Sequence, residues 1–246
     1  MIHIEETDST NRWMKEMKQG NGSFVTSRDV TKEPFPCFIV VAEYQTAGKG
    51  CGSNSWESER GKNLTFSMLI HPEGLSANEQ FQITEVVSVA LCETLENYIG
   101  NKVEIKWPND IYVDGKKICG ILIENRLQGS VIKDCIIGIG LNVNQREFLS
   151  DAPNPVSLYQ LTGQETDREK LLNRFLKAFE RTLHSKTTCY DYRERLFRKE
   201  KEALYEDKAG RFTARLIDVL PDGRLLLADN EDQKRLYAFK EVQFII

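Results

Sequence analysis

The chain has 246 residues, of which 40% are hydrophobic and 28% are charged, and its formal net charge at pH 7 is -4. This length suits one large domain or a main domain with a small one, and the composition is ordinary for a globular protein. The acidic balance gives no electrostatic footprint for nucleic acid, no stretch of about 18 apolar residues is present to span a membrane, and no secretory signal is visible at the N-terminus. Six cysteines are scattered without a CxxC pair or clustered histidines, which argues against a zinc site and for reduced thiols in a cytosol.

The first segment combines a short predicted strand, residues 2–6, with a predicted helix that follows Asp8-Ser9-Thr10-Asn11 and ends at Gly20. These four residue types are common helix N-caps, and capping alone explains the run. Hydroxyl groups and backbone N–H donors at an open helix start also suit a polar ligand group. The run is therefore a candidate binding element as well as a cap.

A glycine-rich segment, residues 43–56, follows an apolar strand that we predict over residues 38–42. Its three glycines among small polar residues predict a mobile loop whose backbone approaches a ligand closely. Lys49 within this loop is suited to meet a carboxylate or a phosphate as a point charge. Most loops of this kind are only flexible connections, and the P-loop pattern GxxxxGK[ST] is absent.

A strand over residues 63–70 and then a long helix are predicted next. Residues 76–79 (SANE) match a capping box for this helix, and Gly100 matches its end. Apolar side chains recur at helical spacing between these two signals, which indicates a structural helix.

Residues 103–124 (VEIKWPNDIYVDGKKICGILIE) have the pattern of a strand, a turn and a further strand. Asp114-Gly115 supplies the positive backbone angles that a tight hairpin needs. The hairpin carries Asn109 and Asp110 near the mouth of one strand and Lys117 near the start of the next. A carboxylate and an ammonium group on rigid strands suit a site for a phosphate and its metal. A surface ion pair on an ordinary hairpin is the alternative interpretation.

The next predicted strand, residues 131–139, runs into Gly138-Ile139-Gly140-Leu141-Asn142. Glycines at alternate positions leave one face of a strand bare, which either makes room for a flat ligand or marks a bulge.

The C-terminal third begins with a helix that we expect to be capped by residues 166–169 and continues through a shorter helical piece. The charge run over residues 193–202 is interpreted as solvated surface or a linker. From about residue 203 the pattern changes to a period of two, and strands are predicted over residues 212–219, 225–228 and 236–239. Short strands joined by turn residues indicate a small β-barrel.

Four motifs carry a resemblance to a known family. KWPND at residues 106–110, followed seven residues after its aspartate by KICGILIE, is very similar to the signature of biotin–protein ligases. The DSTN run at residues 8–11 is identical to a family motif. Residues 45–56 resemble the family's QxAGRGRRGRxW segment, and residues 138–142 resemble its GxGxN element. The resemblance covers essentially the whole chain, with the motifs in the family's order.

The resemblance implies an α+β fold. Residues 1–200 are expected to form a catalytic domain with a mixed β-sheet flanked by helices, similar to class II aminoacyl-tRNA synthetases. Residues 201–246 are expected to form a small SH3-like β-barrel. The implied activity joins biotin to ATP as biotinyl-5′-AMP and transfers biotin to a lysine of a biotin carboxyl carrier protein domain. We expect a cytoplasmic, monofunctional ligase without an N-terminal DNA-binding domain, as a monomer or weak homodimer that binds neither nucleic acid nor membrane.

The same resemblance assigns residue roles. Biotin contacts are assigned to polar and glycine residues: Ser9, Thr10, Asn11, Gln45, Gly48, Lys49, Lys117, Gly120, Gly138 and Gly140. Contacts with ATP or the adenylate are assigned to Lys49, Gly50, Cys51, Trp56, Asn109, Lys117 and Asn142. Three residues are assigned catalytic roles: Lys117 stabilises charge on the biotin carboxylate and α-phosphate, Asp110 orients or deprotonates the acceptor amine, and Lys49 steadies the intermediate. Trp56 is expected to stack on adenine, and Mg²⁺ to be held mainly by phosphates. The residues do not separate a catalytic from a structural role for Lys106.

The chain departs from the family pattern at Cys51-Gly52-Ser53-Asn54, where the family often has Arg-Arg-Gly-Arg. A charge-assisted contact is roughly twice as strong as a neutral one, so we expect looser retention of the biotinyl-adenylate here.

Three alternative functions are weighed from the sequence. A lipoate–protein ligase uses the same adenylation logic, although its RRxSGGG loop is absent here. By the same resemblance a biotin-sensing repressor would carry a winged helix before the DSTN motif, and the seven residues before Asp8 and the acidic net charge disfavour DNA binding. A non-catalytic biotin-binding module is suggested only by the missing loop arginines.

Overall fold

The computed structural model describes residues 1–19, 37–52, 54–100, 103–150 and 152–246. The predicted end of the first helix at Gly20 lies outside the described residues. The chain divides into two compact units, one of residues 1–77 with 118–173 and the other of residues 78–117 with 174–246. The predicted domain boundary between residues 200 and 201 falls inside the second unit, and the division into residues 1–200 and 201–246 stays a prediction.

The first unit is built on a β-sheet. Its strands, in spatial order, are β1 (Ile2–Ile4), β2 (Phe38–Ala42), β3 (Leu64–Ile70), β7 (Val131–Leu141) and β6 (Lys116–Gln128). β1 is parallel to β2, whereas β2–β3, β3–β7 and β7–β6 are antiparallel, which confirms the predicted mixed sheet. Every residue of β3 is buried, as expected for a central strand covered on both faces.

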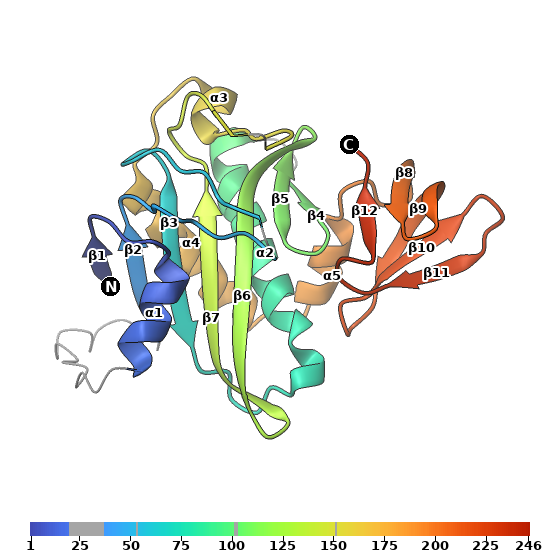
Figure 1. Cartoon of the computed structure of the whole chain (residues 1–246), viewed down its shortest axis with the longest axis horizontal. Coiled ribbons are helices and arrows are strands. Elements are labelled where there is room, and N and C mark those ends of the chain that lie inside the picture. Colours follow the sequence, from blue (N-terminus) through green and yellow to red (C-terminus); the bar gives the residue numbers. More distant parts are fainter. Residues whose placement is uncertain (20–36, 53, 101–102, 151) are drawn as a thin grey trace. The chain divides into compact units, whose positions relative to one another are not determined.

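Helix α1 (Thr10–Gln19) covers part of one face of this sheet (Figure 1). Met14 packs with buried residues of β2, β3 and β7: Val40, Leu69 and Ile136. The rings of Trp13 and Phe38 stack with centroids 6.4 Å apart. Burying apolar area of this kind stabilises the helix more than its intrinsic propensity does.

The first unit also contains helix α3 (Leu158–Thr162) and the first residues of α4 (Arg168–Leu183), since its boundary falls after Asn173. α4 is capped by Asp167, whose carboxylate accepts hydrogen bonds from the backbone N–H groups of Glu169 and Lys170 at 3.1 and 3.0 Å. The predicted cap over residues 166–169 was therefore one residue early, because the aspartate and not the threonine receives these bonds.

In the second unit, helix α2 (Phe81–Ile99) is followed by β4 (Glu104–Lys106) and β5 (Asp110–Val113), and β6 begins at Lys116. β5 and β4 complete the order of the seven-stranded sheet after β6. The predicted tight turn is confirmed, since Asp114 and Gly115 have φ angles of 49° and 74°. Gly100 also ends α2 as predicted, in a left-handed conformation with φ of 63°.

The predicted capping box at residues 76–79 is wrong. Residues 77–79 form a short 3₁₀ helix (η2, Ala77–Glu79), and α2 begins after Gln80, whose side chain makes no capping hydrogen bond. The reason lies in the first unit, where Ser76 forms a β-bridge with Val131 and the Ala77 N–H donates to the Ser130 carbonyl at 2.9 Å. These contacts hold Ser76 and Ala77 beside residues 130–131, and the α-helix begins only after Gln80.

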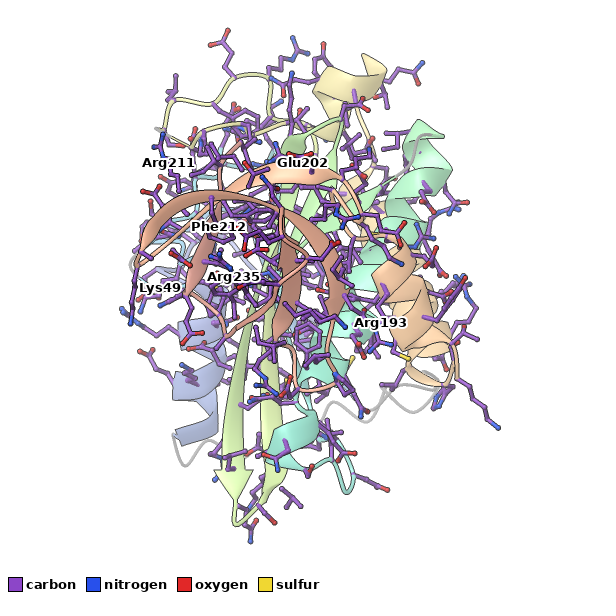
Figure 2. The ribbon with its side chains drawn as sticks, turned by 90° about the vertical axis from the view of Figure 1, so that its right-hand side faces the viewer. Lys49, Arg193, Glu202, Arg211, Phe212 and Arg235 are labelled. Carbon is purple, nitrogen blue, oxygen red and sulfur yellow. The ribbon has the colours of Figure 1, made fainter. Side chains whose placement is uncertain are left out.

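The C-terminal sheet has five antiparallel strands. They are β8 (Glu202–Asp207), β9 (Gly210–Val219), β10 (Leu225–Asp229), β11 (Lys234–Tyr237) and β12 (Val242–Phe244), in the order β11-β10-β9-β8-β12. An aromatic cluster holds it together, with Tyr205 beside Phe212 and Phe244 at 6.0 and 5.0 Å. On this sheet Arg235 lies over the ring of Phe212 at 4.8 Å (Figure 2).

The charge run over residues 193–202 is neither a linker nor simply solvated. Arg193, on α5 (Thr188–Glu194), donates to the Val219 carbonyl at 3.1 Å and pairs with Asp218. Arg195 pairs with Glu96 on α2. The run packs because each of these guanidinium groups has an acceptor inside the second unit.

Among the described helices, none combines the length and the apolar character that crossing a bilayer requires.

Candidate active site

The start of α1 forms a buried polar cluster. Thr10 donates from its backbone N–H and its hydroxyl to Oε1 of Gln45, at 2.8 and 3.1 Å. Ser67 Oγ, on β3, lies 2.7 Å from Thr10 Oγ1 and 2.6 Å from Asn11 Oδ1. Ser9, Thr10 and Asn11 are all buried. The structure thus brings the DSTN motif together with Gln45, and it adds Ser67, which sequence reasoning missed.

Asn11 is fixed by contacts at both ends of its amide. Its Nδ2 donates to Glu124 Oε2 at 2.8 Å and to the Leu122 carbonyl at 3.3 Å. Glu124 also pairs with Lys15 of α1 at 2.6 Å. A Cβ added at Gly138 would lie 2.3 Å from Asn11 Oδ1, so a larger residue there would displace the Asn11 amide. Glu124 was also missed, although its period-two spacing from Gly120 along β6 was a usable signal.

A second glycine of β7 admits an aromatic ring. A Cβ added at Gly140 would lie 2.4 Å from Cε2 of the Trp56 indole. Gly120, Gly138 and Gly140 lie on neighbouring strands, since Gly120 pairs with Gly140 and Leu122 with Gly138. The bare strand face predicted from the glycines therefore holds Asn11 and Trp56 side chains. Its contact with a flat ligand stays a prediction.

The glycine-rich loop is a small hairpin in its described part. Lys49 and Ser55 form an antiparallel bridge, the Gly50 N–H donates to the Asn54 carbonyl, and the Trp56 N–H donates to the Gly48 carbonyl, both at 2.8 Å. A Cβ at Gly48 would lie 2.6 Å from the Trp56 carbonyl oxygen, which explains the glycine. The Lys49 side chain is exposed (Figure 2). Cys51 is half-buried beside this hairpin's turn.

Asn142 stands at the end of β7 with a structural role. Its Nδ2 donates to the Val156 carbonyl at 3.0 Å and its backbone N–H donates to the Ile118 carbonyl at 2.9 Å. Oδ1 of the same side chain is buried and has no hydrogen-bond partner among the described residues. Nearness of Asn142 to an adenylate stays a prediction.

The second unit holds the predicted acid and ammonium pair. Asp110 Oδ1 and Lys117 Nζ are 2.7 Å apart, and both side chains are partly buried. Lys106 lies opposite Asp110 in the β4–β5 register. Its ammonium group is 5.7 Å from the ring centre of Tyr112 and 5.0 Å from that of Phe244. Burial lowers the pKa of Lys106, the charge of Asp110 opposes that shift, and Lys117 and Arg198 add to it.

The turn between β4 and β5 is held by two further hydrogen bonds that sequence reasoning missed. Trp107 Nε1 donates to the Gly223 carbonyl at 2.9 Å, and the Tyr192 hydroxyl donates to the Pro108 carbonyl at 2.9 Å. Asn109, the third residue of this turn, is half-buried.

Comparison with known proteins gives the family. The family model described as the biotin/lipoate A/B protein ligase family matches residues 7–142, which is more than half of the chain. The chain belongs to this family. The match includes every predicted site residue of both units, from Ser9 to Asn142.

Individual members of the biotin/lipoate ligase family show how far the similarity reaches. The bifunctional ligase/repressor BirA of Bacillus subtilis is 33% identical over 218 residues, which cover 81% of this chain and 64% of that protein. The biotin–[acetyl-CoA-carboxylase] ligase of Paracoccus denitrificans is 32% identical over 148 residues, 58% of this chain and 61% of that protein. The chain thus spans less than two thirds of the length of these relatives.

A solved structure of the family matches along the whole chain. The biotin protein ligase of Aquifex aeolicus in complex with biotin and ATP has a TM-score of 0.76 and 26% identity, and 99% of each chain is covered. This likeness extends through the C-terminal sheet and supports the predicted two-part architecture of a mixed sheet with a small β-rich C-terminal part.

Proposed function

We propose that this protein activates biotin with ATP to biotinyl-5′-AMP and transfers biotin to a lysine of a biotin carboxyl carrier protein domain. The observation that carries the proposal is the Asp110–Lys117 pair, held at 2.7 Å on the hairpin that bears KWPND and KICGILIE. The Aquifex aeolicus relative binds biotin and ATP, which supports the choice of both substrates. Site roles below follow from this proposal.

In the first step a biotin carboxylate oxygen attacks the α-phosphorus of ATP, the bond to the bridging oxygen breaks, and pyrophosphate leaves. Phosphoryl transfer of this kind needs positioning and charge stabilisation more than covalent chemistry from the protein. The Lys117 ammonium group would supply that charge from the start of a rigid strand, to both the biotin carboxylate and the α-phosphate. Lys49 steadies the anionic intermediate, and Trp56 stacks on the adenine.

In the second step the acceptor lysine nitrogen attacks the acyl carbon of the adenylate, the bond to the phosphate oxygen breaks, and AMP leaves. The amine must be neutral to attack, and Asp110 orients it and accepts its proton. Asn109, next to Asp110, binds phosphate oxygens.

The first unit would hold the biotin ring end. The polar groups of Thr10, Asn11 and Gln45 are already joined in one network through Ser67, so they are pre-organised for a polar head group, with buried Ser9 beside them. Gly120, Gly138 and Gly140 let that group approach the sheet backbone closely, beside Gly48 and Gly50 of the loop.

Mg²⁺ is assigned to the phosphates of ATP. The described residues contain no group of three or more His, Cys, Asp or Glu side chains placed to hold a metal ion. Mg²⁺ would neutralise phosphate charge when it is bound, and the residues described above bind and orient the reacting groups around it.

The proposal extends to a cytoplasmic protein that acts as a monomer or weak homodimer. Lipoate is the competing substrate, because the matching family includes lipoate ligases by its description. Competition of free biotin against free lipoate in ATP–pyrophosphate exchange tests this choice, and exchange supported by lipoate better than by biotin would reverse the assignment.

The deciding experiment incubates the protein with ATP, Mg²⁺, biotin and an apo carrier domain and measures the mass of the carrier. We expect a gain of one biotinyl group on one lysine, with release of AMP and pyrophosphate. A carrier of unchanged mass, with biotinyl-5′-AMP formed, would restrict the protein to a binding or adenylating module, and no adenylate at all would refute the activity.

A further inference from the structure

We infer that Tyr192 is a positioning residue for Asp110, acting through the Pro108 carbonyl. The inference rests on the proposed function, because Asp110 matters there as the group that orients and deprotonates the acceptor amine. Tyr192 belongs to α5, far along the chain from the KWPND motif, and its hydroxyl donates to the Pro108 carbonyl at 2.9 Å across 84 sequence positions.

The position of Pro108 makes this bond consequential. Residues 107–109 form the turn between β4 and β5, and Asp110 is the first residue of β5. The carbonyl that Tyr192 holds is thus two residues before the carboxylate. Moving this carbonyl changes the backbone direction at which β5 starts, and with it the Asp110–Lys117 geometry.

A second bond fixes the same turn from a different element. The Trp107 indole N–H donates to the Gly223 carbonyl at 2.9 Å, and the Trp107 ring meets that of Phe239 edge-on with centroids 6.3 Å apart. A Cβ added at Gly223 would lie 2.5 Å from the Phe81 ring, so the accepting turn is itself closely packed. Consecutive residues of the turn are therefore held by separate elements of the second unit.

Tyr192 is built to be a permanent donor. Its side chain is 0% exposed, and its ring packs edge-on to Phe81 with centroids 5.5 Å apart. Burial, with the nearby charge of Glu85, raises the pKa of the Tyr192 hydroxyl well above its ordinary value. The hydroxyl therefore keeps its proton at neutral pH, and it donates to the Pro108 carbonyl.

The chain offers two matched controls for removing this hydroxyl. Tyr190 lies on the same helix but is 62% exposed, so Tyr190→Phe tests the same substitution without a buried bond. Tyr205 is as buried as Tyr192, and its hydroxyl has no hydrogen-bond partner among the described residues. Tyr205→Phe therefore removes a buried hydroxyl that holds nothing.

The test measures transfer of biotin from preformed adenylate to a carrier domain, at a temperature where every variant is folded by circular dichroism. Tyr192→Phe should lower the transfer rate constant about tenfold, with the KM for the carrier changed less than about twofold, because one buried hydrogen bond is lost. Tyr190→Phe and Tyr205→Phe should transfer at the wild-type rate.

A double-mutant cycle separates positioning from general destabilisation. If Tyr192 acts through Asp110, Tyr192→Phe should slow transfer by less than about twofold in an Asp110→Asn background. An unchanged rate in Tyr192→Phe, or a full tenfold loss retained in the Asp110→Asn background, overturns the inference while the proposed function stands. Absence of transfer by the wild-type protein overturns both.

Discussion

Gly138→Ala tests whether the biotin side of the site is organised by Asn11. The added Cβ would lie 2.3 Å from Asn11 Oδ1, and contacts under about 3 Å are not tolerated, so the amide must move by close to an ångström. That movement breaks the bond to Ser67 at 2.6 Å and strains the bond to the charged Glu124 at 2.8 Å. A neutral hydrogen bond contributes about 1 kcal/mol and one to a charged group about 1.5–3 kcal/mol.

We therefore expect Gly138→Ala to cost about 2–4 kcal/mol, divided between folding stability and biotin affinity, the latter falling about 10- to 100-fold. Urea unfolding measures the first quantity and calorimetric titration with biotin the second. The matched control is the double variant Asn11→Ala with Gly138→Ala, in which the amide that the new Cβ would meet has been removed. It should be no worse than Asn11→Ala alone, and additive losses in the double variant would refute the reasoning.

Three further outcomes follow from the charges. Lys117→Ala should slow adenylate formation by two or more orders of magnitude, since a desolvated donor aimed at transition-state charge is worth about 2.7–4 kcal/mol, while the exposed neighbour Lys116→Ala stays near the wild-type rate in pyrophosphate release. Burial raises the pKa of Glu85 from 4.5 to about 7, with Arg193 opposing the shift. Ionising Glu85 therefore destabilises the folded state, and this penalty is absent below about pH 4.5 and complete above about pH 7. Glu85→Gln should therefore gain about 2 kcal/mol over wild type at pH 8 and nothing at pH 4.5 in urea unfolding, and an equal gain at both pH values would contradict the burial argument. Biotinyl-5′-AMP should dissociate faster than from an arginine-rich relative, because residues 51–54 lack the basic side chains, and an equal dissociation rate by stopped-flow would reject that expectation.

Local signals predicted the β5–β6 hairpin well because its turn geometry depends on adjacent residues. Asp114-Gly115 adopted the positive φ angles that its residue types favour, and this turn alone brings Asp110 to Lys117. The interaction is short-range in sequence, so a single strand–turn–strand pattern sufficed to predict it.

Long-range partners were missed because a sequence pattern can place a residue on a strand face but does not say which distant residue it contacts. Asn11 is held by Glu124 across 113 positions, and Tyr192 reaches Pro108 across 84. The same limit explains the failed capping box at residues 76–79. Its residue types were those of a cap, but Ser76 forms a β-bridge with the distant Val131 instead of capping α2. Tertiary pairing overrides local preference wherever both compete for the same backbone groups.

The sequence left open whether Lys106 is catalytic or structural. The contacts of its ammonium group with neighbouring side chains favour a structural role. Two aromatic rings flank its ammonium group within about 6 Å, the range in which a ring quadrupole attracts a cation. Asp110, opposite it in the β4–β5 register, adds a favourable charge that partly offsets burial. Lys106 therefore links β4 to Phe244 on β12, and it lies opposite Asp110 across the β4–β5 strand pair. Lys117 pairs with Asp110 directly, and the proposed function assigns the contact with substrate to Lys117.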